Sequence, residues 1–156
     1  MKKTLVVLGL ISFLFLTLMG CGIKSVPTNT NNSLQPKQVI ENYFKYYNEK
    51  NRQGLLSTLT SRHDQPNVVF GFENLKSIKL VSIENDDMNM TDSYLKYGGG
   101  KVNGVKENNV VSYKVTYESV YSKDTSPWSS GKQTEYFTLI KESNNATWLI
   151  DDAGHP

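Results

Sequence analysis

The spacing of apolar residues changes along this chain from a helical repeat to a strand-like alternation, and this change restricts the fold more than any other feature. Directly behind Pro36, which suits the first turn of a helix, aromatic and aliphatic residues recur at helical spacing. This stripe consists of Val39, Ile40, Tyr43, Phe44 and Tyr47. Asn51 and Gly54 interrupt it, and the leucines at 55, 56 and 59 predict a second, short helix that ends near Thr60.

After a polar loop at residues 61–67, the apolar period becomes two. Alternating residues of this kind predict strands that are buried on one face. The predicted strands cover residues 75–84, 111–121, 134–141 and 147–151. Between the first two lies a polar segment, 86–109, which we expect to form a long loop. Helices followed by a meander of long antiparallel strands predict one α+β domain over residues 36–156.

Three segments of this domain resemble a known superfamily. They are the helical run from Val39 to Asn48, the leucine segment Leu55–Leu59 and the closing segment Trp148–Asp152. Together they are similar to the cone-shaped proteins that include nuclear transport factor 2 and ketosteroid isomerase. More narrowly, the chain resembles a family of bacterial lipoproteins designated as a domain of unknown function. The resemblance implies N-terminal helices packed on a curved antiparallel sheet around a concave cavity, but no particular activity, because one fold hosts many functions.

The N-terminus has the pattern of a bacterial lipoprotein signal peptide. Lys2 and Lys3 precede an uncharged segment that ends in Leu18-Met19-Gly20-Cys21, and Cys21 is the only cysteine. We expect residues 1–20 to be removed and Cys21 to be lipidated, with a diacylglyceryl group that supplies two fatty chains for stable anchoring. The alternatives are an ordinary secretory signal, which lacks its usual alanine site here, and an uncleaved membrane anchor, for which the segment is short.

Each of these alternatives places the folded domain outside the cytoplasmic membrane. Residues 21–35 are rich in Asn, Ser and Thr and have no apolar period, so we expect the lipidated cysteine to be followed by a flexible tether. The predicted location is therefore the extracytoplasmic face of the cell membrane, with the lipid anchor as the contact to the bilayer.

Charge and cysteine content exclude several classes of function. The full chain has 17 Lys and Arg against 15 Asp and Glu, and loss of Lys2 and Lys3 with the signal leaves a balance of zero. A neutral domain without a basic stripe is not expected to bind nucleic acid. With Cys21 acylated, no disulfide, cysteine metal site or catalytic thiol is available.

A row of tyrosines is the strongest candidate for a binding pocket. Tyr113, Tyr117 and Tyr121 share one face of the predicted strand, and Tyr43 and Tyr47 share the apolar face of the first helix. Phenols combine ring area with hydrogen bonding, so together they could line an amphipathic pocket. The simpler interpretation is that these rings form the helix–sheet core.

Other polar clusters carry weaker signals. We interpret Asp151, Asp152 and His155 as a solvated strand end, His63 with Asp64 as an exposed turn, and Gly98-Gly99-Gly100-Lys101 as a flexible loop. The acidic residues near Asp86 lack the spacing of a calcium loop. We therefore assign no catalytic residue, no metal ligand and no cofactor from the sequence.

Two hypotheses for the function follow. The first is a non-catalytic, lipid-anchored domain that binds an envelope protein, a cell-wall component or a small ligand, on its own or within a larger envelope complex. The second is an enzyme of the isomerase or dehydratase type with a carboxylate or histidine inside a tyrosine-lined cavity. An ionisable side chain that faces such a cavity is the feature that separates them.

Overall fold

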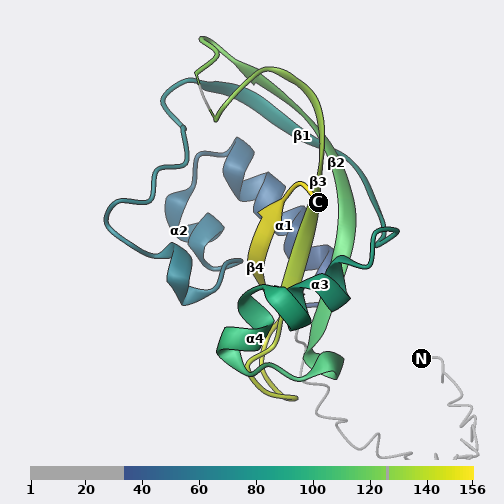
Figure 1. The fold of residues 1–156 in the computed structure, drawn as a ribbon. Coiled ribbons are helices and arrows are strands. Elements are labelled where there is room, and N and C mark those ends of the chain that lie inside the picture. The colour runs from purple at the N-terminus through teal and green to yellow at the C-terminus, as the bar shows by residue number, and fades with distance from the viewer. Residues whose placement is uncertain (1–33, 126) are drawn as a thin grey trace, which may run out of the picture. The chain divides into compact units, whose positions relative to one another are not determined.

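The computed structural model describes residues 34–125 and 127–156, so the predicted signal peptide, Cys21 and most of the tether lie outside the described residues. The chain is a mixed α and β domain (Figure 1). Its elements are α1 (Pro36–Asn48), α2 (Arg52–Leu56), the 3-10 turn η1 (Ser61–His63), β1 (Leu75–Asn85), α3 (Met90–Tyr97), α4 (Gly99–Asn103), the 3-10 turn η2 (Glu107–Asn109), β2 (Val110–Tyr121), β3 (Gly131–Ile140) and β4 (Leu149–Gly154). No helix among the described residues is long and apolar enough to cross a membrane.

The four strands form one antiparallel sheet in the order β1-β2-β3-β4. The pairing of β2 with β3 is regular from Val110 opposite Ile140 to Ser119 opposite Gly131. The β1–β2 and β3–β4 pairings contain register shifts, which bend strands and increase their twist. The three long strands curve around α1 in Figure 1.

Helix α1 packs its apolar stripe against one face of this sheet. Pro36 lies in its first turn, and the Gln35 backbone N–H donates to Gln38 Oε1 at 2.8 Å, which satisfies a donor at the helix start. Val39, Ile40, Phe44 and Tyr47 are buried, and they join the main core with residues such as Val115 and Phe137. The predicted helix and its buried face are confirmed.

The second predicted helix is shorter than expected and lies earlier in the sequence. Asn51 accepts a hydrogen bond from the Gly54 backbone N–H, so it caps α2, and Gly54, expected to lie between the two helices, lies inside α2. The helix ends at Leu56, and the following residues run parallel to β4. There Ile150 N donates to Thr58 O and Thr60 N donates to Ile150 O, each at 2.9 Å.

The expectation of a long loop over residues 86–109 is wrong, and so is the flexible loop at Gly98–Lys101. This segment contains α3 and α4, and α4 begins at Gly99. A second apolar cluster explains the order: Tyr94 of α3 packs with Val110 and Ile140. Ile140 neighbours Leu139, which belongs to the main core, so the two clusters lie on opposite faces of the sheet.

Candidate functional site

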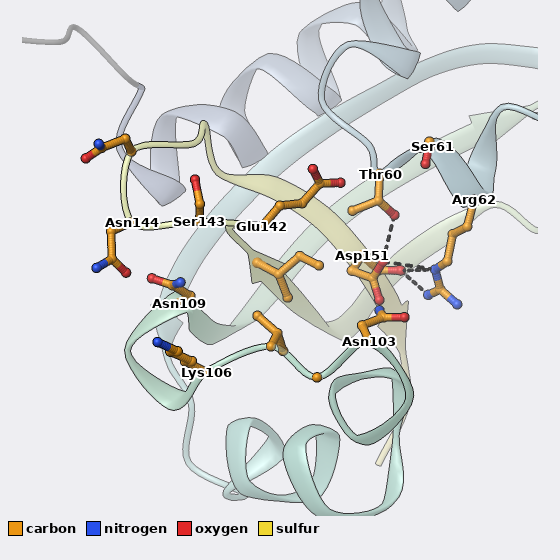
Figure 2. Close-up of a pocket in the computed structure, with 14 residues that line it drawn as sticks. Thr60, Ser61, Arg62, Asn103, Lys106, Asn109, Glu142, Ser143, Asn144 and Asp151 are labelled. Carbon is orange, nitrogen blue, oxygen red and sulfur yellow. Dashed lines mark hydrogen bonds and ion pairs between the residues drawn. The ribbon is translucent and has the colours of Figure 1, made fainter.

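A polar cavity of about 730 Å³ opens beside β4, between the segment after α2, the segment from α4 to η2 and the β3–β4 hairpin (Figure 2). Its volume falls within the range of small-molecule sites. Charged side chains of both signs and several amides face it, among them Arg62, Asn103, Lys106, Asn109, Glu142 and Asn144. Such a lining can hold a small polar ligand through several hydrogen bonds at once.

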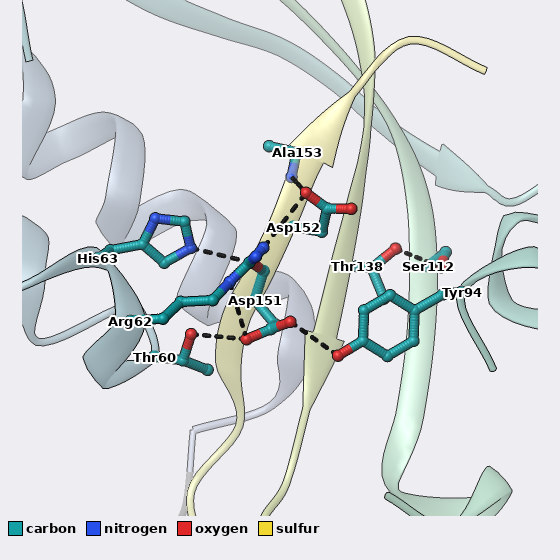
Figure 3. Close-up of polar contacts among 9 residues, drawn as sticks. All are labelled: Thr60, Arg62, His63, Tyr94, Ser112, Thr138, Asp151, Asp152 and Ala153. Atoms are coloured by element: carbon teal, nitrogen blue, oxygen red, sulfur yellow. Dashed lines mark hydrogen bonds and ion pairs between the residues drawn. The ribbon is translucent and has the colours of Figure 1, made fainter. Parts of the chain in front are cut away.

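The carboxylate of Asp151 lies at the wall of this cavity and is only 2% exposed. Its Oδ1 accepts from the Thr60 hydroxyl at 2.7 Å, and its Oδ2 accepts from the Tyr94 hydroxyl at 2.7 Å (Figure 3). The Arg62 Nε lies 3.2 Å from Oδ1. A buried carboxylate with several donors and an opposite charge is stabilised against the cost of leaving water.

Arg62 contacts Asp151 and also lines the polar cavity. Its Nε donates to the Asp151 backbone carbonyl at 2.8 Å, its Nη2 contacts the same oxygen, and Nη2 lies 3.3 Å from Asp152 Oδ1. The His63 Nε2 lies 2.9 Å from that carbonyl. The Arg62 side chain remains 49% exposed. These contacts fix the guanidinium at the cavity edge while part of it stays open to a ligand.

Three consecutive glycines explain how α4 approaches this cluster so closely. A Cβ atom on Gly99 would lie 3.1 Å from Asp151 Oδ2 and 3.1 Å from the Tyr94 hydroxyl. A Cβ on Gly100 would lie 2.9 Å from the Tyr94 ring, which is closer than carbon atoms normally pack. Gly99 and Gly100 are therefore required for the close packing of α4 against Tyr94 and Asp151.

The environment of Tyr94 favours its neutral phenol. Burial raises the pKa of Tyr94 above its usual value, and the hydrogen bond and negative charge of Asp151 raise it further. Tyr94 consequently stays a hydrogen-bond donor to Asp151 at neutral pH.

The tyrosines predicted to line a pocket lie mostly around a second, smaller cavity of about 190 Å³ on the α1 side of the sheet. Tyr43, Tyr47, Tyr117 and Tyr121 line it together with Trp128. They also pack against the main core, so the pocket and core interpretations describe the same rings. Tyr113 does not line this cavity, and the ammonium of Lys37 lies 5.3 Å from its ring centroid.

One ionisable residue in this smaller cavity was missed by sequence reasoning. Glu135 of β3 faces the tyrosines and accepts a hydrogen bond from the Tyr117 hydroxyl at 2.9 Å. The sequence contained the signal for it. Glu135 lies two positions before Phe137 in the same strand, so both side chains lie on the face of the sheet that carries the main core.

The two carboxylates of the C-terminal acidic pair differ in exposure, although both contact the Arg62 guanidinium and the β3–β4 pairing shifts register at this point. Asp151 is buried and Asp152 is 61% exposed, so interpreting Asp151 as part of a solvated strand end is wrong. The sequence pattern could not show that Thr60, Arg62 and Tyr94 contact the Asp151 carboxylate, because the positions of these residues depend on tertiary packing. His155 is exposed, whereas His63 is half-buried against β4. No group of three or more His, Cys, Asp or Glu residues suited to a metal ion occurs within residues 34–125 and 127–156.

Comparison with known proteins gives a family. The comparisons with curated proteins and with solved structures each found no match. Residues 37–154 match the family described as Domain of unknown function (DUF4829), which covers α1 to β4 and therefore both cavities. The chain belongs to the DUF4829 family.

Proposed function

We propose that this protein is a lipid-anchored binding domain that is displayed outside the cytoplasmic membrane and holds a small polar ligand in the cavity beside Asp151. The N-terminal sequence supports the location, because Lys2 and Lys3, the uncharged segment and the final Gly20-Cys21 form a lipoprotein signal. Cys21 is the lipidated residue in this proposal, and residues 22–35 are the tether.

We also propose that the domain has the cone-shaped architecture of the nuclear transport factor 2 superfamily. The N-terminal helix against one face of a four-stranded antiparallel sheet supports this, as do the bends at the register shifts in β1 and β4. In such a cone, α1 and the inner face of the sheet enclose the tyrosine cavity.

The polar cavity is the single observation that carries the binding role. It combines two cationic side chains, Arg62 and Lys106, with two carboxylates and several asparagine amides around a volume that suits a small molecule. Because the charges balance, the lining favours a ligand that is rich in hydroxyl and amide groups over a strongly charged one. Cell-wall fragments made of amino sugars and short peptides have this chemistry.

The test is titration of the full-length protein, solubilised in dodecyl maltoside, with a soluble disaccharide-peptide fragment of peptidoglycan, monitored by calorimetry. We expect saturable binding, and we expect Lys106→Ala and Asn144→Ala each to weaken it by roughly tenfold, since each removes a hydrogen bond worth about 1.4 kcal/mol. Lys123→Ala, an exposed lysine outside the cavity, is the matched control. Absence of binding, or equal binding by wild type and both cavity variants, would contradict the proposed role.

A second candidate function rests on Glu135. A carboxylate among phenols, hydrogen-bonded to Tyr117, is the kind of group that an isomerase or dehydratase uses as a base. Turnover of a steroid or hydroxyacyl substrate that is abolished by Glu135→Gln would favour the enzyme over the binding domain.

A further inference from the structure

The smaller cavity is bounded by aromatic rings that come from three separate parts of the fold. Two tyrosines come from α1, two from β2 and one indole from the β2–β3 connection; they are Tyr43, Tyr47, Tyr117, Tyr121 and Trp128. Their positions are fixed by close contacts. The Tyr43 and Tyr47 ring centroids lie 5.7 Å apart, and a Cβ atom on Gly71 would lie 2.7 Å from the Trp128 ring.

Aromatic faces have a definite electrostatic preference. The π-systems of Tyr, Trp and Phe carry negative potential on their faces, which attracts a cation that lies within about 6 Å of a ring centroid. The attraction grows when the site is shielded from water, because the local dielectric is low. Burial raises the pKa of the Tyr43 and Tyr117 phenols, and the negative charge of Glu135 raises it further.

Glu135 is the one charged side chain among the described residues that line this cavity. It is half-buried, and it makes no ion pair within the described part of the chain. Its Oε1 accepts from the Tyr117 hydroxyl at 2.9 Å, and the same hydroxyl lies 3.1 Å from Gln133 Oε1. The cavity therefore has a net negative charge and no lysine or arginine to neutralise it.

We propose that this aromatic cavity binds a compact organic cation, a quaternary ammonium group, with the ring faces around the methyl groups and Glu135 as the counter-ion. An anion would be repelled by Glu135. A neutral apolar molecule would leave the Glu135 carboxylate facing it without an opposite charge, which costs free energy. A metal cation would need several oxygen ligands, and the lining offers one carboxylate.

This site is separate from the polar cavity, so it stands or falls independently of the proposed function. The cavities share no lining residue, and they lie on opposite faces of the sheet. The volume of about 190 Å³ suits a headgroup of the size of choline rather than a larger ligand.

The test is choline titration of the full-length protein in dodecyl maltoside, monitored by tryptophan fluorescence because Trp128 lines the cavity. We expect saturable binding of choline, and no saturable binding of 3,3-dimethylbutan-1-ol, which has the same shape without the charge. Glu135→Gln should weaken choline binding by tenfold or more, since loss of a shielded opposite charge costs at least about 1.4 kcal/mol. Phosphocholine distinguishes a lipid headgroup from a free cation, since a headgroup site tolerates the phosphate and a free-cation site does not.

Two controls keep the outcome clear. Glu135→Gln preserves the acceptor for the Tyr117 hydroxyl, so its melting temperature should stay close to that of the wild type, and Glu118→Gln changes an exposed charge on β2 without touching the cavity. Lys106→Ala in the polar cavity should leave choline binding unchanged. The proposal is overturned if choline fails to bind at millimolar concentration, if the neutral analogue binds equally well, or if folded Glu135→Gln binds choline as the wild type does.

Discussion

The Tyr94 hydroxyl donates a hydrogen bond of 2.7 Å to the buried carboxylate of Asp151, and this contact joins residues 57 positions apart in the sequence. It fastens α3 to the last strand of the sheet. Thr60 binds the other oxygen of the same carboxylate, so the segments before β1, between β1 and β2, and at the C-terminus meet at one side chain. The polar cavity lies against this junction. Its shape therefore depends on a hydrogen-bond network rather than on apolar packing alone.

Replacement of the buried acid tests this dependence. Asp151→Asn keeps the size of the side chain but removes the charge that Arg62 faces and one acceptor that Thr60 or Tyr94 needs. We expect a loss of about 2–4 kcal/mol in the free energy of unfolding, measured by urea denaturation. Asp152→Asn, whose side chain is 61% exposed, should change it by less than about 0.5 kcal/mol. Equal effects of the two substitutions would show that the burial of Asp151 contributes nothing.

The secondary structure around the main core was predictable because it depends on local pattern. The stripe from Val39 to Tyr47 gave α1, and the alternation from Val111 to Tyr121 gave β2 within one residue. The helices at residues 90–103 were not predictable in this way. Their apolar face is short, and the two glycines inside α4, Gly99 and Gly100, disfavour a helix by about 1 kcal/mol each. The tertiary contacts of Tyr94 with Val110 and Ile140 therefore outweigh local propensity.

The same distinction applies to the two cavities. Four of the five predicted pocket tyrosines line the smaller cavity, because periodicity alone places them on facing surfaces of α1 and β2. The polar cavity is lined by residues in loops and at the ends of helices and strands, such as Asn109 and Asn144. Their positions depend on the tertiary fold and not on any apolar repeat in the sequence. Sequence patterns therefore brought these four tyrosines together and missed the residues of the polar cavity.

The pKa of Tyr94 gives a prediction at alkaline pH. Burial and Asp151 raise its pKa in the folded state above the unfolded value of 10.0, so below pH 10 the phenol is protonated in both states and its contribution to stability is complete. Above pH 10 the unfolded chain loses this proton first, and stability falls.

Tyr94→Phe should remove this component of the pH dependence. At neutral pH we expect a loss of about 1.5–3 kcal/mol, because a hydrogen bond to a carboxylate is absent. Above pH 10 the free energy of unfolding of the wild type should fall more steeply than that of the variant, by up to about 1.4 kcal/mol per pH unit. Urea denaturation across this pH range measures both effects. Tyr97→Phe, which alters an 86% exposed ring, is the control. If its stability changes with pH differently from that of the wild type, the loss of stability above pH 10 is not specific to Tyr94.

The glycine run offers a test in which helix propensity and packing oppose each other. Alanine is a better helix former than glycine by about 1 kcal/mol, so Gly100→Ala in α4 would stabilise an isolated helix. In the folded domain the new methyl group would lie 2.9 Å from the Tyr94 ring and would push it from Asp151. We expect net destabilisation of about 1–3 kcal/mol, seen as a lower melting temperature. Gly154→Ala meets no atom within 4 Å and serves as the control.

Membrane attachment through Cys21 is the prediction on which the proposed lipid anchor depends. A diacylated cysteine holds a protein at a bilayer because two chains are buried at about 0.8 kcal/mol per methylene, whereas an unmodified chain has no such anchor. In cells, the wild-type protein should fractionate with membranes and carry the mass of a diacylglyceryl group on a mature chain that begins at Cys21. The Cys21→Ser variant should carry no added lipid mass. Variant chains that ordinary signal peptidase cleaves should no longer fractionate with membranes. Ser25→Ala lies in the predicted tether and leaves the predicted signal unchanged, so this variant should behave as the wild type. A wild-type protein that retains residues 1–20 and has no added lipid would instead identify the N-terminal segment as an uncleaved anchor.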